Sequence, residues 1–131
     1  MKPATILVVE DESICGIAIQ ETLQRAGHVV PEPIASGDDV LAAVLRHRPD
    51  IVIMDIRLKS YIDGIDAAQR LRMVSSVPVI YVTAYPASYA EDRMARSAPA
   101  ACLEKPLDEA KLLGHIERIL AEPRKPAGLP F

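Results

Sequence analysis

The chain has 131 residues, the length of one ordinary domain with a single hydrophobic core. Half of it is hydrophobic but only 4% is aromatic, so the core must consist of aliphatic side chains. The net charge is −3 with interleaved acids and bases, which excludes the clustered basic face of a nucleic-acid-binding protein. No apolar run approaches the roughly 20 residues of a membrane span, and no signal peptide is visible. We therefore expect a cytoplasmic protein that contacts neither nucleic acid nor membrane.

Short runs rich in β-branched residues alternate with longer amphipathic patterns. The runs that predict strands lie at 5–9, 29–35, 51–55, 79–83 and 100–103. The patterns that predict helices lie at 13–26, 36–48, 63–74, 87–97 and 108–121, the last with Asp108 as its N-cap. Pro31 and Pro33 lack a backbone donor, so the second strand is expected at a sheet edge. Five strand–helix units in succession predict an α/β fold, a parallel sheet with helices on both faces.

The end of the chain has a different composition. Residues 122–131 contain three prolines and two basic residues, which predicts an extended or disordered tail. We expect one domain over 1–121 and no output domain beyond it.

The cysteines and histidines form no metal-binding or catalytic pattern. Cys15 and Cys102 lie far apart in the sequence, and we expect both thiols to be free. His28, His47 and His115 are scattered, and each is expected at the surface or at a helix end.

Polar side chains follow the predicted strands where these end, and the carboxyl ends of parallel strands lie at one edge of a sheet. They are Glu10 and Asp11 after the first strand, Asp55 closing the third, Thr83 closing the fourth and Lys105 after the fifth. Three carboxylates in one pocket repel one another unless a cation lies among them, and oxygen ligands alone suit Mg²⁺ or Mn²⁺. An aspartate can attack phosphorus, while a metal and a lysine neutralise the transferred group.

Each of these side chains also has a purely structural interpretation. The acidic run 10–12 could be a solvated turn that favours the next helix N-terminus. Asp55 could be a strand-end acid, Thr83 an ordinary strand former and Lys105 a surface lysine. The occurrence of all five in this order favours the functional interpretation.

The segments that carry these residues resemble the response-regulator receiver domain of two-component systems. The matching segments are ILVVEDE at 6–12, DIVIMD at 50–55, DG at 63–64, PVIYVTA at 78–84 and EKP at 104–106. The resemblance covers about residues 4–121. It implies a flavodoxin-like doubly wound fold with a five-stranded parallel sheet in the order 2-1-3-4-5.

The resemblance also implies a role for each site residue. Asp55 matches the phosphoacceptor, Glu10 and Asp11 match the acidic metal pair, and the backbone carbonyl of Arg57 completes the metal shell. The residues that bind the phosphoryl group are Thr83, Ala84 and Lys105. The Lys105–Pro106 peptide bond is expected to be cis.

One position departs from the family pattern. Cys102 stands three residues before Lys105, where the family usually has Tyr or Phe. We expect this cysteine to be a small core residue. The usual aromatic gate cannot operate there, and Tyr85, two residues after Thr83, is a hypothetical substitute that could equally be a packing residue.

The resemblance predicts a single-domain response regulator rather than an enzyme. A histidine kinase or histidine phosphotransfer protein would phosphorylate Asp55, and a protein partner would read the 87–121 surface. One alternative is a receiver-like docking module that is never phosphorylated. A less favoured alternative is an aspartate-nucleophile phosphohydrolase, because Arg57 stands where such enzymes have a second acid. A nucleotide-binding protein fits poorly, since no glycine-rich loop follows the first strand.

Overall fold

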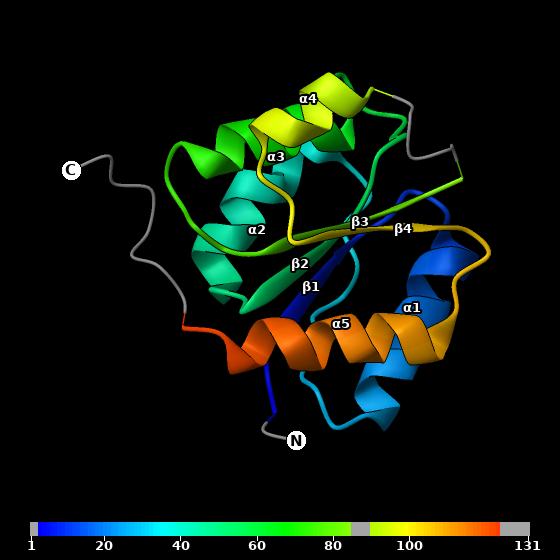
Figure 1. Cartoon of the computed structure of the whole chain (residues 1–131). Helices are drawn as coiled ribbons and strands as arrows, with labels where there is room; N and C mark the ends of the chain where they lie inside the picture. The colour runs from blue at the N-terminus through cyan, green and yellow to red at the C-terminus, as the bar shows by residue number, and fades with distance from the viewer. Residues whose placement is uncertain (1–2, 85–89, 124–131) are drawn as a thin grey trace.

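The centre of the molecule is a parallel sheet of apolar strands (Figure 1). A computed structural model describes residues 3–84 and 90–123. Within these ranges the strands are β1 (Ile6–Val9), β2 (Ile51–Asp55), β3 (Val79–Thr83) and β4 (Ala101–Glu104), in the order β1-β2-β3-β4. The first three are buried along their whole length, as expected for parallel strands covered on both faces. Residues of β4 alternate between half-buried and exposed, as suits an edge strand.

The segment predicted as the second strand is not a strand. It joins β1 through two isolated parallel bridges, Thr5↔Val29 and Val9↔Ile34. Pro31 and Pro33 lie between these bridges and cannot donate a backbone hydrogen bond, so pairing is interrupted there. The described sheet therefore has four strands rather than five, and the five-stranded order stays a prediction.

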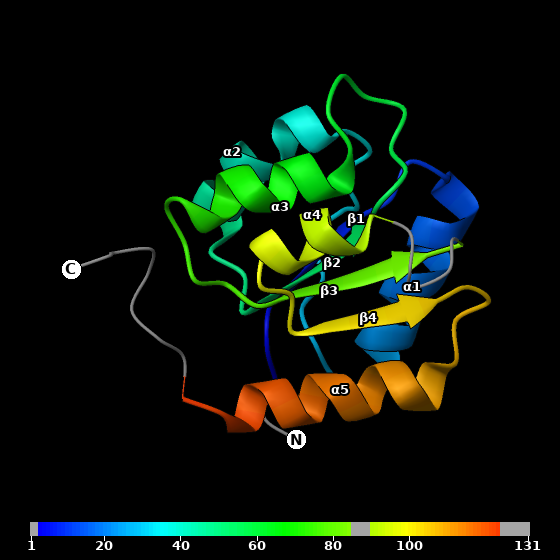
Figure 2. The ribbon, with the colours of Figure 1, turned by 45° about the horizontal axis from the view of Figure 1, so that its top comes forward.

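Helices cover both faces of the sheet, as predicted (Figures 1 and 2). They are α1 (Ser13–Arg25), α2 (Val40–His47), α3 (Gly64–Arg72), α4 (Glu91–Arg96) and α5 (Glu109–Ala121), with a 3₁₀ turn η1 (Gly37–Asp39) before α2. One core cluster packs α1 and α5 on the first face, and the other packs α2, α3 and α4 on the second. Among the residues described, no helix has the length and apolar character needed to cross a membrane.

Local sequence explains where several helices begin and end. Gly27, with φ of +96°, lets the chain turn back after α1. Asp63 caps α3 by accepting from the Asp66 N–H at 2.8 Å, and Asp66 accepts from the Asp63 N–H in return. Asp108 accepts from the backbone N–H of Lys111 at 3.1 Å, which confirms it as the N-cap of α5.

The prediction that His28 lies at the surface is wrong. Its side chain is buried, and its Nδ1 accepts a hydrogen bond from the Ala4 N–H at 3.1 Å. Burial lowers its pKa, because a charged imidazole is poorly solvated there. The turn at Gly27 returns the chain to the start of β1, a tertiary contact that an isolated histidine in a sequence does not reveal.

Candidate functional site

The parallel register brings the ends of the strands together at one edge of the sheet. Val9 pairs with Met54, and Asp55 pairs with Val82. Glu10, which follows Val9, and Thr83, which follows Val82, therefore lie at the same edge of the sheet as Asp55.

Three carboxylates meet at this edge. Oxygen atoms of Glu10, Asp11 and Asp55 all lie within 4.8 Å of one another. Glu10 and Asp55 are buried, whereas Asp11 is partly exposed. Asp11 accepts a hydrogen bond from the Lys59 N–H at 2.9 Å, so the loop after β2 also positions it. A cluster of carboxylate oxygens that is open on one side fits a hard divalent cation such as Mg²⁺, which retains waters in its shell.

Lys105 closes the other side of the cluster. Its Nζ donates to Glu10 Oε2 at 2.9 Å and lies 3.4 Å from Asp55 Oδ2. Burial opposes the charge of this lysine, but the hydrogen bond to Glu10 and the charge of Asp55 outweigh it and raise the pKa of Lys105. The amine therefore stays protonated beside the two acids.

Asp55 lies in a poorly solvated position next to another acid. Burial, followed by the hydrogen bond with Glu10 and its charge, raises the pKa of Asp55 to about 7, although Lys105 acts in the opposite direction. A cation at the three carboxylates would favour the ionised form of Asp55, which is the nucleophilic form.

The remaining predicted site residues lie around this cluster. Thr83 is buried at the end of β3, and its carbonyl accepts from the Lys105 N–H at 2.8 Å. Arg57 and Ala84 are exposed. The roles of the Arg57 carbonyl, the Thr83 hydroxyl and Ala84 stay predictions. The Lys105–Pro106 peptide bond is cis, as the resemblance implied.

The prediction that Cys102 belongs to the core is wrong, because its side chain is exposed. On β4, Ala101 and Leu103 face the α1–α5 core, so Cys102 and Glu104 face the other way. Cys102 pairs in register with Tyr81 of β3, which is fully buried. Tyr85 lies outside the described residues, so its gating role stays a hypothesis.

Gly64 is a site residue that chemical reasoning alone missed. A Cβ atom at this position would lie 2.0 Å from the Asp55 carbonyl oxygen. Its N–H donates to the Ile56 carbonyl at 2.8 Å, which holds the start of α3 against the end of β2. Only glycine permits this approach, and the Asp63-Gly64 pair in the family pattern was the available signal.

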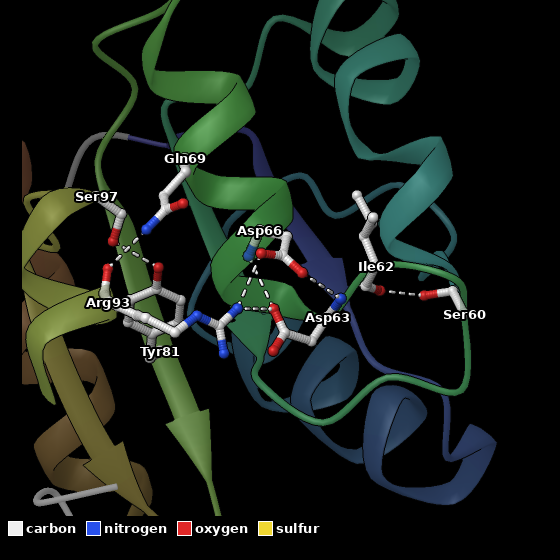
Figure 3. Close-up of polar contacts among 8 residues, drawn as sticks. All are labelled: Ser60, Ile62, Asp63, Asp66, Gln69, Tyr81, Arg93 and Ser97. Atoms are coloured by element: carbon white, nitrogen blue, oxygen red, sulfur yellow. Dashed lines mark hydrogen bonds and ion pairs between the residues drawn. The ribbon is translucent and has the colours of Figure 1, made fainter. Parts of the chain in front are cut away.

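A second polar cluster, between α3, α4 and β3, was also missed (Figure 3). Arg93 lies between Asp63 and Asp66, and the Tyr81 hydroxyl contacts Ser97. The available signal was a tyrosine in an otherwise apolar buried strand, because a buried phenol needs a hydrogen-bond partner.

Comparison with known proteins agrees with this geometry. The model of the response regulator receiver domain family matches residues 6–117. The transcriptional regulatory protein PdtaR of Mycobacterium tuberculosis is 29% identical over 115 residues, which are 88% of this chain and 56% of PdtaR. The polar-differentiation response regulator DivK of Brucella anthropi is 24% identical over 123 residues, which are 92% of this chain and 98% of DivK.

Among solved structures, the receiver domain of the sensor histidine kinase PA1611 from Pseudomonas aeruginosa PAO1 is similar, with a TM-score of 0.83 and 27% identity. The likeness covers 92% of this chain and all of that domain, which has a magnesium ion coordinated in its active-site cleft. The chain spans about half the length, or less, of the first curated relatives it matches. Since the family match runs from β1 into α5, the chain belongs to the response regulator receiver domain family of two-component signalling.

Proposed function

We propose that this chain is a single-domain response regulator that accepts a phosphoryl group on Asp55. The observation that carries the proposal is the surroundings of this carboxylate. Asp55 is buried, its oxygen lies within 4.8 Å of the oxygens of Glu10 and Asp11, and the Lys105 amine is 3.4 Å away. The donor would be a histidine kinase or a histidine phosphotransfer protein, as is usual for the family.

Each residue of the site would have a separate role in phosphoryl transfer. Glu10, Asp11 and Asp55, with the Arg57 carbonyl, would hold Mg²⁺ or Mn²⁺, which supplies positive charge for the phosphoryl oxygens. An Asp55 oxygen forms a bond to phosphorus while the bond from phosphorus to the donor imidazole breaks. Lys105 neutralises charge on the transferred group, and the Thr83 hydroxyl donates to a phosphoryl oxygen. The burial of Asp55 limits access of water to the product.

The phosphodonor would dock beside α1. This helix begins directly after the acidic pair and exposes Ile14 and Ile17, the first of them 85% exposed. Apolar side chains exposed next to the acceptor give a partner a surface to bury. We place the protein in the cytoplasm, where such donors present their histidines.

Output would pass through the 87–121 surface to a protein partner. In the described part of this surface, Cys102 and Glu104 of β4 are exposed, and Met94 is the only buried residue of the short helix α4. We expect at most slow self-phosphorylation and self-dephosphorylation. A phosphohydrolase fits less well, because the exposed Arg57 occupies the position of a second acid. The exposed Cys102, in place of the usual aromatic, favours a docking module as the second candidate.

Intact mass spectrometry tests the proposal. The protein is incubated with Mg²⁺ and acetyl phosphate or phosphoramidate, and we expect one phosphoryl adduct. Asp55→Asn should abolish it, whereas Asp39→Asn, which changes an exposed aspartate outside the site, should retain it. Rapid release of phosphate over many turnovers would indicate a hydrolase. No adduct with any donor or cognate kinase would leave the docking module.

A further inference from the structure

Helix α4 owes its position to contacts with its neighbours. It has six residues, of which Met94 alone is buried, and a helix this short is unstable in isolation. Ala90 and Ala98, on either side of it, have φ of 53° and 48°. This left-handed conformation is unfavourable for alanine, so surrounding contacts must maintain it.

Arg93 ties α4 to the start of α3 (Figure 3). Its Nη2 donates to Asp63 Oδ1 and to Asp66 Oδ1, both at 2.9 Å, and its carbonyl accepts from Gln69 Nε2 at 3.0 Å. The two aspartates form the capping box of α3. They follow the loop that leaves Asp55, so α4 is attached to the segment that carries the phosphoacceptor.

Ser97 ties the other end of α4 to the sheet (Figure 3). The Tyr81 and Ser97 hydroxyl oxygens are 2.6 Å apart, and both side chains are fully buried. Ser97 Oγ is also 2.6 Å from the Met94 carbonyl, which only accepts. The Ser97 hydroxyl therefore donates to Met94, and the Tyr81 hydroxyl donates to Ser97.

Tyr81 connects this contact to the strand-end site. Side chains alternate along a strand, so Tyr81 and Thr83 lie on the same face of β3. The paired position on β4, Cys102, is exposed and carries no ring. On this face of the sheet, the aromatic residue that contacts the end of α4 is therefore Tyr81 on β3, two residues before Thr83.

We propose that the Tyr81–Ser97 hydrogen bond holds α4 in its unphosphorylated arrangement, and that phosphorylation of Asp55 moves α4 by breaking this bond. The inference rests on the proposed phosphorylation. Recruitment of the Thr83 hydroxyl by the phosphoryl group displaces the end of β3, and Tyr81 moves with it. Ala90 and Ala98 are strained in the described arrangement, and relief of this strain when α4 moves lowers the free energy that the movement requires.

Hydrogen exchange of the full chain tests this inference. Beryllofluoride with Mg²⁺, as a phosphoryl mimic, should accelerate amide exchange across 90–98 in the wild type. Tyr81→Phe keeps the ring but removes the hydroxyl, so exchange there should be about fivefold faster without the mimic, the factor that corresponds to the typical contribution of one hydrogen bond. The mimic should then add little. Tyr61→Phe is the matched control, because Tyr61 is 93% exposed, and it should behave as the wild type.

Three results would overturn the inference. The first is exchange at 90–98 in Tyr81→Phe within twofold of the wild type. The second is an equal response to the mimic in both proteins. Ser97→Ala provides a second variant that should accelerate exchange over the same residues, and unchanged exchange in it also counts against the inference.

The phosphoryl adduct separates this inference from the proposed function. Tyr81→Phe should form the Asp55 adduct as the wild type does, because the hydroxyl is removed outside the acid cluster. A wild type without an adduct refutes the proposed function and the phosphorylation half of the inference. A normal adduct with unaltered α4 exchange refutes the inference alone.

Discussion

Two polar and partly buried regions of the molecule are assembled differently. One is the strand-end site, and the other is the polar cluster between α3, α4 and β3, called here the α3–α4 contact. The members of the α3–α4 contact are Asp63, Asp66, Tyr81, Arg93 and Ser97. At the strand-end site, each side chain closes or directly follows a strand, and parallel pairing brings the strand ends together. In the α3–α4 contact, Tyr81 lies within a strand, Arg93 within a helix and Ser97 at a helix end. These side chains meet only because the helices pack in one particular way. The first arrangement follows from chain order, and the second depends on tertiary packing.

The difference predicts how the two regions respond to substitution. Changes at the strand-end site should affect phosphoryl transfer, and those that disturb its buried groups should also lower stability. Changes at the α3–α4 contact should affect α4 and leave phosphoryl transfer intact.

Gly64→Ala should have the largest effect, because the new Cβ would lie 2.0 Å from the Asp55 carbonyl oxygen. The backbone of β2 or α3 must move, and overpacking of this severity costs about 3 kcal/mol or more of unfolding free energy. Chemical denaturation measures this loss, and adduct formation should fall because Asp55 is displaced. Gly114→Ala is the matched control. Apart from its chain neighbours and the nearby backbone of α5, no described atom lies within 4 Å of the new Cβ, so the unfolding free energy should rise by about 0.5–1 kcal/mol. Equal stability of the two variants would contradict the geometry.

Lys105→Met should rank second. It leaves the carboxylates of Glu10 and Asp55 buried without their cation. Because the lysine is partly exposed, we expect a loss of about 2 kcal/mol, below the range for a fully buried pair. Urea titration without Mg²⁺ should show this loss, and Mg²⁺ should recover part of it. Lys111→Met, at an exposed position on α5, should change stability little. If Mg²⁺ stabilised neither the wild type nor Lys105→Met, the acid cluster would not be a cation site.

Asp11→Asn also tests whether the acid cluster binds a cation, and it changes no buried group. Asp11 is the partly exposed member of the cluster, so its neutralisation should leave the apo protein nearly as stable as the wild type. A ligand at ten times its Kd stabilises the folded state by about 1.4 kcal/mol, and Asp11→Asn should lose most of this gain at the same Mg²⁺ concentration. Thermal unfolding with and without Mg²⁺ measures the difference. Asp39→Asn should keep the full gain.

These two regions also mark how far sequence reasoning extends. Glu10, Asp11, Asp55 and Lys105 were identified from their places at strand ends, and the structure brings them together. The prediction for Cys102 failed because β4 lies at the edge of the sheet, where the burial of a side chain depends on tertiary packing. The strand expected at 29–35 became two bridges because Pro31 and Pro33 outweighed its β-branched residues. The hydrophobic periodicity of the sequence predicts neither the partner of Tyr81 nor the burial of His28, since each depends on a contact with a residue distant in the chain.

Arg93→Gln tests the α3–α4 contact by charge. The guanidinium lies on two partly exposed aspartates, so its loss should cost about 1 kcal/mol or less. The deficit should shrink in 1 M salt, because salt screens exposed pairs. Denaturation at low and high salt measures it, with the exposed Arg96→Gln as control. Adduct formation on Asp55 should not change. A large fall in adduct formation would contradict the expectation that changes at the α3–α4 contact leave phosphoryl transfer intact.

His28 should give the smallest effect, and it lies in neither region. Its folded-state pKa is lower than that of the unfolded chain, so the unfolded chain binds more protons as pH falls. The contribution of the neutral imidazole is therefore fully present above about pH 6.5 and is lost as pH falls toward the folded-state pKa. His28→Gln removes this titration and should flatten the fall of unfolding free energy on the acid side of pH 6.5, while the exposed His47→Gln should retain the wild-type slope. Denaturant titrations across this pH range measure both slopes. Because His28 contacts Ala4 rather than the acid cluster, adduct yields at neutral pH should match the wild type.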